Sequence, residues 1–522
     1  MTTPERASGP ESEPAATAAR AYHERTRHSP DSVRRSGYRL NWENQPIPFK
    51  IYTSDLPVVA LPQQVPPSDA RMIETLLRGV PADENTPLDL PHLARILFLS
   101  AGVVRTRRYP SGHLQMFRAA ACTGALYHID VYVACADIDG LEAGVYHFGP
   151  HDFALRRLRA GDHRGALVEA TGGAREIAEA QAVLVLASTY WRNSWKYRER
   201  AYRHSYWDSG TILANVLALA DADGIASKVF AGFVDAEVER LLGLDPQCEG
   251  VTALVALGRG QRRPEPGDSA AALAPLELAT QPLSPRPVHY ALLTHTHHAT
   301  AMTSPGQVAA WRAGAMLRRG PEAGDGAREL APPAIADRSL DETILRRGSA
   351  RLFEQAPITE EELSALLACA ASGMDCDFAR SRADRVCDTY VIVHDAGDLP
   401  MGAYYYDAGS GRLQPLSARV TRHGSGFVAL EQDLAADAAV NVYSLCDLEG
   451  VFRALGGRGY RAASLEGAVA GGRAYLAAYA MGLGATGLTF YDDYATQTFE
   501  PHAEGKSVMF LTAVGHRTRS SA

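Results

Sequence analysis

The second half of this chain repeats the first, and the repeat limits what the chain can fold into. Residues 201–203 match 459–461, and residues 211–222 match 469–480 without a gap. A sequence that recurs in this way folds as similar units packed against each other. At 522 residues the chain is also too long for one ordinary hydrophobic core. We therefore predict a tandem duplication with two domains.

Composition indicates a globular protein, with 46% hydrophobic and 21% charged residues. A net charge of -8 argues against a nucleic-acid partner. No stretch approaches the roughly 18 apolar residues of a membrane span, and the N-terminus has no apolar signal core. We expect a cytoplasmic protein without a membrane partner. Its seven cysteines form no C-x-x-C pair, so we expect reduced and mostly buried thiols.

The pattern of elements predicts the segments of the chain. An amphipathic stretch over 90–102 reads as a helix ended by a glycine, and Thr359 as the cap of another helix. An aromatic arm over 22–50 is expected to be anchored by Trp42 and Phe49. The predicted segments are a disordered N-terminus (1–20), a first domain (21–260), a Pro-rich linker and connecting segment (261–335) and a second domain (336–518).

The stretch from Tyr190 to Asp208 is the most unusual in composition. It holds three of the five tryptophans and five cations, against two acidic residues. One interpretation is an amphipathic helix that packs Trp191, Trp195 and Tyr202 and leaves its arginines in water. On this interpretation the stretch is structural.

The other interpretation makes the same stretch a site. Lys196 and Tyr197 are adjacent, so their side chains can converge on one ligand. Crowding by Arg198 and Arg200, together with burial among indoles, would lower the pKa of Lys196 and make it a usable base.

Two further segments suit a phosphorylated ligand. Small residues lead into a strand pattern over 117–133, where backbone amides can approach a flat or phosphorylated ligand, although a tight strand entry explains them equally well. Residues 345–353 hold three arginines and a serine, which form a natural phosphate clamp or else an exposed basic turn. The first half has no such string over 76–86.

Together these segments resemble the flavin-dependent nitroreductase superfamily. The order of basic-aromatic helix, apolar helix, strand and a Gly-Phe pair at 232–233 is similar, and the adjacent Lys-Tyr pair resembles the SagB/ThcOx branch of azoline dehydrogenases. The resemblance implies an α+β fold. Each half would be a mostly antiparallel sheet flanked by helices, and the halves would form an intrachain pseudo-dimer.

The resemblance also implies FMN as the cofactor. Residues 118–126 resemble the ring-contacting loop of the branch, with Cys122 in place of a serine and His128 in place of a proline. The string over 346–351 resembles the element that holds the flavin phosphate. The cofactor-binding residues expected on this basis are Arg118, Ala120, Ala121, Cys122, Gly124, Leu126, Ala231, Gly232, Arg346, Arg347, Ser349, Arg351 and Arg517.

The second copy has lost the Lys-Tyr pair. In the register of the repeat, Ala454 and Leu455 take the places of Lys196 and Tyr197, and charged residues over 375–388 replace the small ones of the loop. We therefore expect one complete FMN site, composed from both halves, and one vestigial site.

The activity implied by the resemblance is oxidation of a thiazoline or oxazoline ring to an azole, in a peptide or a carrier-bound intermediate. Lys196 would be the base, Tyr197 a proton partner or positioner, amides near Gly232 would tune the flavin, and oxygen would reoxidise it. Partner biosynthetic enzymes and further homo-oligomerisation are compatible with this activity.

Two alternatives stay open. One is an NAD(P)H-dependent reductase of nitro compounds or quinones, or a flavin oxidase of another amino-acid-derived metabolite. The other is a non-catalytic scaffold in a biosynthetic complex. We expect no metal site, because His295, His297 and His298 lack matched ligand spacing. Gly467, Gly471 and Gly472 are explained by close helix packing rather than by a nucleotide loop.

Overall fold

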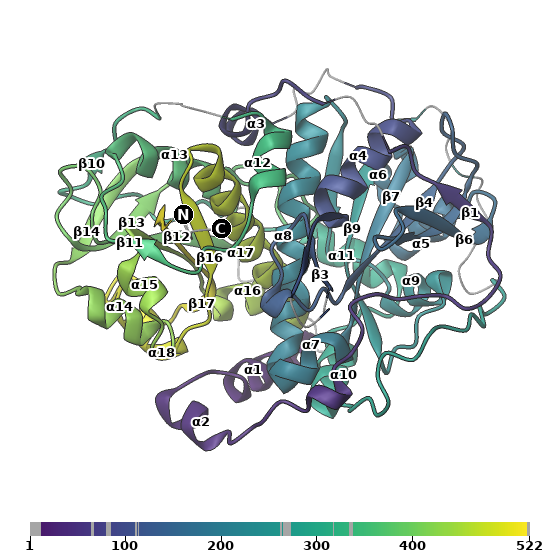
Figure 1. Ribbon diagram of the computed structural model, residues 1–522, viewed down its shortest axis with the longest axis horizontal. Helices are drawn as coiled ribbons and strands as arrows, with labels where there is room; N and C mark the ends of the chain where they lie inside the picture. Colours follow the sequence, from purple (N-terminus) through teal and green to yellow (C-terminus); the bar gives the residue numbers. More distant parts are fainter. Residues whose placement is uncertain are drawn as a thin grey trace.

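The structure is a computed structural model that describes residues 12–63, 67–79, 85–109, 112, 114–260, 264, 273–316, 318–333 and 338–518. Two antiparallel sheets lie side by side, and the long helices α8 (Ala201–Ala222) and α17 (Gly459–Ala480) run between them (Figure 1). Each of these helices packs on its own sheet and on the other helix. The predicted α+β architecture of two tandem units is confirmed.

The first sheet has the strand order β1-β6-β5-β4-β7-β9-β8, and β2 and β3 form a separate hairpin. The strands of the first half are β1 (Val58–Ala60), β2 (Val103–Arg108), β3 (Leu114–Arg118), β4 (Ile129–Cys135), β5 (Gly144–Gly149), β6 (Ala154–Ala160), β7 (Ala182–Thr189), β8 (Ser227–Phe230) and β9 (Glu249–Leu257). The other helices before residue 260 are α1 (Ser12–Arg25), α2 (Pro30–Arg35), η1 (Trp42–Asn44), α3 (Met72–Arg78), α4 (Leu90–Ala101), η2 (Thr123–Ala125), α5 (Arg164–Ala170), α6 (Arg175–Glu179), α7 (Tyr190–Tyr197), η3 (Arg198–Arg200) and α9 (Asp235–Leu242).

The second sheet repeats this order. Its path is β10-β14-β13-β12-β15-β17-β11, with β16 paired to β17 as β8 is to β9. Its strands are β10 (Arg328–Glu329), β11 (Phe353–Glu354), β12 (Cys387–Val393), β13 (Gly402–Asp407), β14 (Arg412–Ser417), β15 (Val440–Cys446), β16 (Gly484–Gly487) and β17 (Ser507–Arg517). The remaining helices are α10 (Ala291–Ala299), α11 (Pro305–Ala313), α12 (Leu340–Arg346), α13 (Glu360–Ala370), α14 (Arg422–Val428), α15 (Asp433–Asp437), α16 (Leu448–Leu455), η5 (Gly456–Arg458) and α18 (Asp492–Gln497).

Small residues let α8 and α17 cross closely. A Cβ on Gly210 would lie 2.5 Å from the Cβ of Ala468, and a Cβ on Gly472 would lie 2.6 Å from that of Ala214. In the register of the repeat each contact joins a residue to its own counterpart, so the helices cross at the pseudo-twofold axis. The other two glycines expected to pack against helices face β17 instead: Gly467 lies against Met509, and Gly471 against Phe510.

Buried ion clusters join the halves on both sides of this crossing. Arg203 donates to Asp492 at 2.7 Å, and Arg200 lies 3.3 Å from the same carboxylate. Across the axis, the carboxylate of Asp235 accepts from the corresponding arginines of the second half, at 2.6 Å in each case. All of these side chains are buried. Each aspartate begins a helix, whose N-terminus also favours its negative charge.

Helix α1 begins well inside the segment expected to be disordered. The prediction is wrong for residues 12–20, which form the first part of α1, while residues 1–11 lie outside the described residues. Ala16 and Ala19 are buried, and the backbone at Gly457 lies against the α1 backbone. Alanine favours helix, and here a partner half covers the alanine face, which composition alone does not reveal.

The C-terminal end of α1 belongs to the repeat as well. Arg203 donates to the carbonyl of His23 at 2.7 Å and to the hydroxyl of Thr26 at 3.0 Å. In the other half, the equivalent arginine donates to the carbonyl of His297 at 2.5 Å and to the hydroxyl of Thr300 at 2.9 Å. Helix α10 therefore repeats α1. The described residues of the segment expected to be a linker carry α10, α11 and β10, and they complete the second half.

Two other expectations about the first half need correction or support. Phe49 is buried and anchors the arm, but Trp42 is 67% exposed and only its ring edge meets Trp195. Helix α4 ends before Gly102, as predicted.

All seven cysteines are free and five of them are buried, so the prediction of mostly buried thiols is confirmed. Among the residues that the structure describes, no helix is long and apolar enough to cross a membrane.

Removing one aspartate of an ion cluster should destabilise the whole chain. Asp492→Asn leaves Arg200 and Arg203 buried without a counter-charge, so we expect the free energy of unfolding to fall by about 3–5 kcal/mol in urea titrations. Burial opposes ionisation, yet the two arginines hold the pKa of Asp492 well below its usual range. This stabilisation is therefore present above about pH 4, the pKa of an unfolded aspartate, and is lost as the pH falls.

The control is Asp31→Asn, which removes an exposed partner of Arg34 and should cost less than about 1 kcal/mol. Equal losses in the two variants would contradict the role given to the buried cluster.

Candidate active site

Lys196 and Tyr197 end α7, the helix that follows β7. Lys196 is exposed, and its Nζ lies 5.2 Å from the centre of the Tyr197 ring. Tyr197 is half-buried, and its ring meets His204 edge to face with 4.6 Å between centroids. Partial burial, and then the charge of Arg351 from the second half, lower the pKa of Lys196. Lys196 is therefore neutral more often than an ordinary lysine.

The rest of this stretch combines both interpretations of its sequence. Trp191 and Trp195 pack together with Leu126, which agrees with the structural interpretation for these two residues, whereas Tyr202 lies on α8 in a different hydrophobic cluster. Three of its four arginines are not in water, however: Arg192, Arg200 and Arg203 are buried, and Arg192 donates to Asp130 at 2.9 Å, while Arg198 is partly exposed. The stretch also does not form one helix, because the chain turns sharply after Tyr197.

That turn occurs at Arg198, whose φ of 51° lies in the left-handed region. The second half makes the same turn at Gly456, with a φ of 56°. Glycine adopts this backbone without a steric cost, whereas arginine adopts it only with strain. The first half therefore carries local strain next to the Lys-Tyr pair. The strain marks the pair as a site where geometry is imposed by the surrounding structure.

The loop at Gly124 lies against Tyr197. A Cβ on Gly124 would lie 2.7 Å from the Tyr197 hydroxyl, so only glycine allows this approach. The loop passes from buried Ala120 to Ala121, whose carbonyl accepts from Thr211 at 2.7 Å. The structure therefore brings the predicted ring-contacting loop and the predicted catalytic pair together.

Arg347 joins the second half to this loop. Its guanidinium donates to the carbonyls of Arg118, Ala119 and Ala120 at 3.0, 2.7 and 3.1 Å. Burial lowers the pKa of Arg347. Arg347 thus acts as a strut that fixes the loop from the opposite half.

Arg118 is a second strut. It is buried, and it donates to the carbonyls of Ile129 at 3.1 Å and Pro48 at 2.7 Å. The rings of Phe49 and Tyr127 flank its guanidinium. Burial lowers its pKa to about 10. Its contacts tie the loop to β4 and to the N-terminal arm.

The other predicted phosphate-clamp residues are exposed on the surface of the second half. Arg346 pairs with Glu342 at 2.9 Å, and the hydroxyl of Ser349 lies 3.3 Å from that of Tyr475. Arg517 is exposed and lies over the ring of Tyr479. Arg351 is also exposed. Exposed guanidinium groups beside a hydroxyl are a donor set that fits a phosphate monoester.

Ala231 and Gly232 do not belong to this site, and their predicted place beside the Lys-Tyr pair is wrong. The carboxylate of Asp377 already accepts from their amides, at 2.8 and 2.9 Å. The Trp311 ring covers Gly232, and its Nε1 donates to the carbonyl of Leu455, the counterpart of Tyr197. The loop after β8 crosses to the site of the other half, which sequence order does not reveal.

That second site is therefore filled by side chains of the protein. Besides Asp377 and Trp311, the guanidinium of Arg382 occupies its far end, where a Cβ on Gly79 would lie 2.5 Å from it. Arg382 is paired with Asp221 at 3.2 Å. In the register of the repeat, Leu488 and Thr489 correspond to Ala231 and Gly232.

The first half has a counterpart of the clamp helix after all. Helices α3 and α12 begin side by side: Met72 donates to the carbonyl of Arg338 at 3.2 Å, and Leu340 to that of Ala70 at 2.8 Å. The expected absence over 76–86 concerns the arginine-serine string and stays as predicted: α3 runs directly from Arg78 into Gly79 without an equivalent of Arg347, and residues 80–84 lie outside the described residues.

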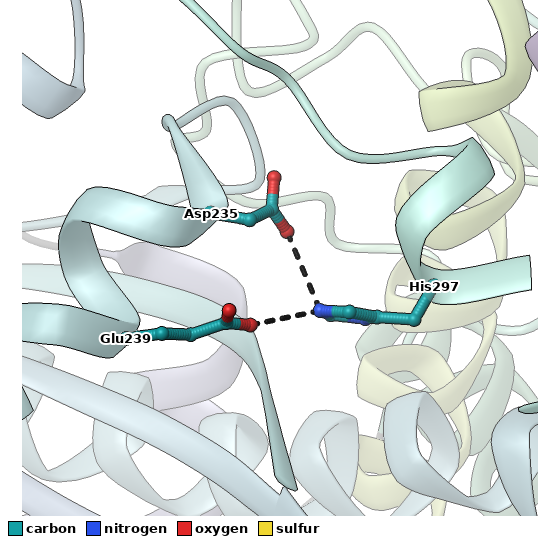
Figure 2. A group of neighbouring side chains, drawn as sticks. All are labelled: Asp235, Glu239 and His297. Atoms are coloured by element: carbon teal, nitrogen blue, oxygen red, sulfur yellow. Dashed lines mark hydrogen bonds and ion pairs between the residues drawn. The ribbon is translucent and has the colours of Figure 1, made fainter. Parts of the chain in front are cut away.

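A buried group of possible metal ligands lies at the joint between the halves (Figure 2). His297 Nε2 lies 2.9 Å from Glu239 and 3.8 Å from Asp235. Two arginines already neutralise Asp235. Burial, and then the charge of Asp235, raise the pKa of Glu239 to about 8, so it is mostly protonated at neutral pH. We assign the group to the joint, and the absence of a metal stays a prediction.

Three residues that shape the two sites were not predicted: Asp208, Asp377 and Trp311. In the register of the repeat, Asp208 aligns with Glu466. Both residues are acidic, and this shared charge is a signal in the sequence. Asp377 lies among the charged residues that replace the small loop. The sequence gives no signal for Trp311, because this residue lies in the connecting segment, where the sequence alone does not reveal the repeat.

Comparisons with known proteins extend over most of the chain. The Nitroreductase family matches residues 84–259 and 344–516. A provisionally named nitroreductase of Methanocaldococcus jannaschii is 29% identical over 182 residues, covering 34% of this chain and 88% of that protein. The microcin B17-processing protein McbC of Escherichia coli is 30% identical over 149 residues, covering 28% of this chain and 50% of McbC.

One solved structure matches nearly the whole chain. The crystal structure of a provisionally named nitroreductase from Anabaena variabilis superimposes with a TM-score of 0.76 at 24% identity, covering 96% of this chain and 99% of that one. This likeness supports the two-unit fold over its full length.

Relieving the strain at Arg198 should stabilise the chain. We expect Arg198→Gly to raise the free energy of unfolding by about 1 kcal/mol, because glycine adopts the left-handed backbone without the steric cost. Chemical denaturation measures the change. Arg198→Ala is the control, since it removes the same side chain but keeps the Cβ, and it should give no such gain. Equal stabilities of the two variants would contradict backbone strain at this turn.

Proposed function

Because the chain belongs to the nitroreductase family, we propose that it is an FMN-dependent dehydrogenase that oxidises thiazoline or oxazoline rings to azoles. The observation that carries the proposal is the contact between the Lys196-Tyr197 pair and the loop at Gly124. That contact brings together Lys196 as a base of lowered pKa, the hydroxyl of Tyr197 and the backbone at Gly124. The corresponding place in the second half has neither the lysine nor the tyrosine.

The substrate is proposed to be a peptide or a carrier-bound intermediate. The match to McbC supports this class, since the name of that protein describes the processing of microcin B17. Partner biosynthetic enzymes that form the azoline ring are part of the same proposal. An exposed Lys196 is compatible with a substrate that arrives on a larger carrier.

Residues from both halves would hold the cofactor. Ser349, Arg351 and Arg517 of the second half would bind the phosphate of FMN, since guanidinium forks pair with phosphate oxygens. Arg346 lies next to them, on the last turn of α12. The loop held by Arg347 would lie against the ring system. When bound, FMN supplies an acceptor for a hydride.

Lys196 and Tyr197 have separate tasks. Oxidation of an azoline removes a proton from one ring carbon and a hydride from its neighbour, and the Nζ of Lys196 would take the proton. Burial, and then the nearby Asp208 and Cys122, raise the pKa of Tyr197. Its hydroxyl therefore stays protonated and can donate a hydrogen bond that orients the substrate ring.

Loss of the base should remove turnover but not cofactor binding. We expect Lys196→Ala to lower kcat by about 10²–10⁴-fold on an azoline peptide, with FMN still bound. In the wild type, kcat should fall as the pH drops, because Lys196 becomes protonated. Lys228→Ala is the control, as this lysine pairs with Glu176 on the surface. Unchanged turnover in Lys196→Ala with FMN bound would exclude the lysine as base.

The filled second site predicts one FMN per chain. Visible absorption of the purified protein and quantification of the released cofactor measure this ratio. Two FMN per chain would contradict the closure by Asp377 and Trp311, and none after soaking with FMN would favour a scaffold. Rapid bleaching of the flavin by NADPH would favour a reductase of nitro compounds or quinones over the dehydrogenase.

A further inference from the structure

The loop over 122–128 is held from behind by a single carboxylate. Asp208, on α8, is 3% exposed. It accepts from the thiol of Cys122 at 2.9 Å, from the amide and hydroxyl of Thr123 at 2.9 and 2.7 Å, and from Nε2 of His128 at 2.9 Å. Both ends of the loop therefore converge on one side chain.

The loop needs such a restraint because its backbone is strained. Gly124 has a φ of 65°, and Ala125 and Tyr127 have φ values of 54° and 49°. The last two are not glycines, and left-handed backbone at such residues persists only where surrounding contacts impose it. The hydrogen bonds to Asp208 lie on both sides of this strained segment, and Gly124 in its middle lies against the Tyr197 hydroxyl.

The residues that depart from the pattern of similar dehydrogenases meet at this carboxylate. Cys122 and His128 stand where a serine and a proline were expected, and both bind Asp208. His128 continues the network through Ser188 at 2.9 Å to Ser205, also at 2.9 Å. The network thus ties the loop to β7 and to α8, the elements on either side of α7, which ends in the Lys-Tyr pair.

From these contacts we infer that Asp208 is a positioning residue, which holds the strained loop against Tyr197 and so sets the geometry of the Lys-Tyr site. Asp208 acts through the loop and not on substrate. The effect on turnover rests on the proposed function, whereas the effect on the loop does not.

The second half supplies a matched comparison. Glu466 stands at the equivalent position on α17 and accepts from the amides of Val386 and Cys387, both at 2.7 Å. It is also a helix carboxylate, half-buried, that holds the start of the central strand β12. Its segment, however, lies at the filled site that lacks the Lys-Tyr pair. A general structural role would make the two carboxylates equivalent, and a positioning role would not.

The test compares Asp208→Asn with Glu466→Gln in the FMN-loaded chain. The first readout is the rate of Cys122 alkylation by iodoacetamide, mapped by mass spectrometry, with exposed Cys248 as the internal reference. Burial, and then Asp208, raise the pKa of the Cys122 thiol. Asp208→Asn should therefore speed alkylation of Cys122 by at least about tenfold. Glu466→Gln should leave it unchanged.

The second readout separates kcat, KM and FMN affinity on an azoline peptide. Asp208→Asn should lower kcat by at least about tenfold, with FMN affinity reduced less than about threefold, because the phosphate is held from the other half. Glu466→Gln should leave kcat at the wild-type value. Parallel losses of kcat and FMN affinity in both variants would overturn the positioning role.

A milder variant covers the case in which Asp208→Asn fails to fold. Thr123→Val removes one hydroxyl donor to Asp208 and keeps the carboxylate. It should speed Cys122 alkylation by a smaller factor than Asp208→Asn. An unchanged alkylation rate in both variants would overturn the inference. Since alkylation needs no substrate, an inactive wild type would contradict the proposed azoline chemistry while leaving this readout decisive.

Discussion

The buried pairing of arginines in one half with an aspartate in the other is the constraint on which the rest of the structure depends. Charged groups this deep are stable only when paired and hydrogen-bonded, so neither half can leave the other without exposing or orphaning them. Their reciprocal placement fixes the crossing of α8 and α17 at Gly210 and Gly472. That crossing in turn sets where each half can reach into the other, and hence where a site composed from both can form.

On this symmetric frame the two sites have diverged in opposite ways. One keeps a strained turn at Arg198 and a strained loop, both of which cost stability, together with an exposed lysine that a substrate can reach. The other has a glycine at the same turn, and a carboxylate and an indole in the space between the halves. Leu430 and Glu431 of the second half are also left-handed, but the strained turn at Arg198 and the strained loop both lie beside the Lys-Tyr pair, as expected if their strain serves chemistry there.

Much of this organisation could be predicted from the sequence. The repeat predicted the tandem architecture and the loss of Lys196 and Tyr197 in the second copy, because aligned residues keep aligned positions, and the motifs around Lys196 and Arg346 indicated the family. The exchange of segments between halves could not be predicted, since Ala231 and Gly232 follow α8 in sequence but lie at the other site. Nor could the role of Arg347, because a guanidinium suits carbonyls as well as phosphate. The role of each predicted cofactor residue stays a prediction.

The filling of the second site by Trp311 and Asp377 has a consequence for evolution. In a homodimer every substitution appears twice, so a side chain that blocks one site blocks both and abolishes the enzyme. Joining two copies in one gene removes that coupling. Each copy can then mutate alone, and a surface once committed to a ligand becomes free to acquire packing that rigidifies its neighbour.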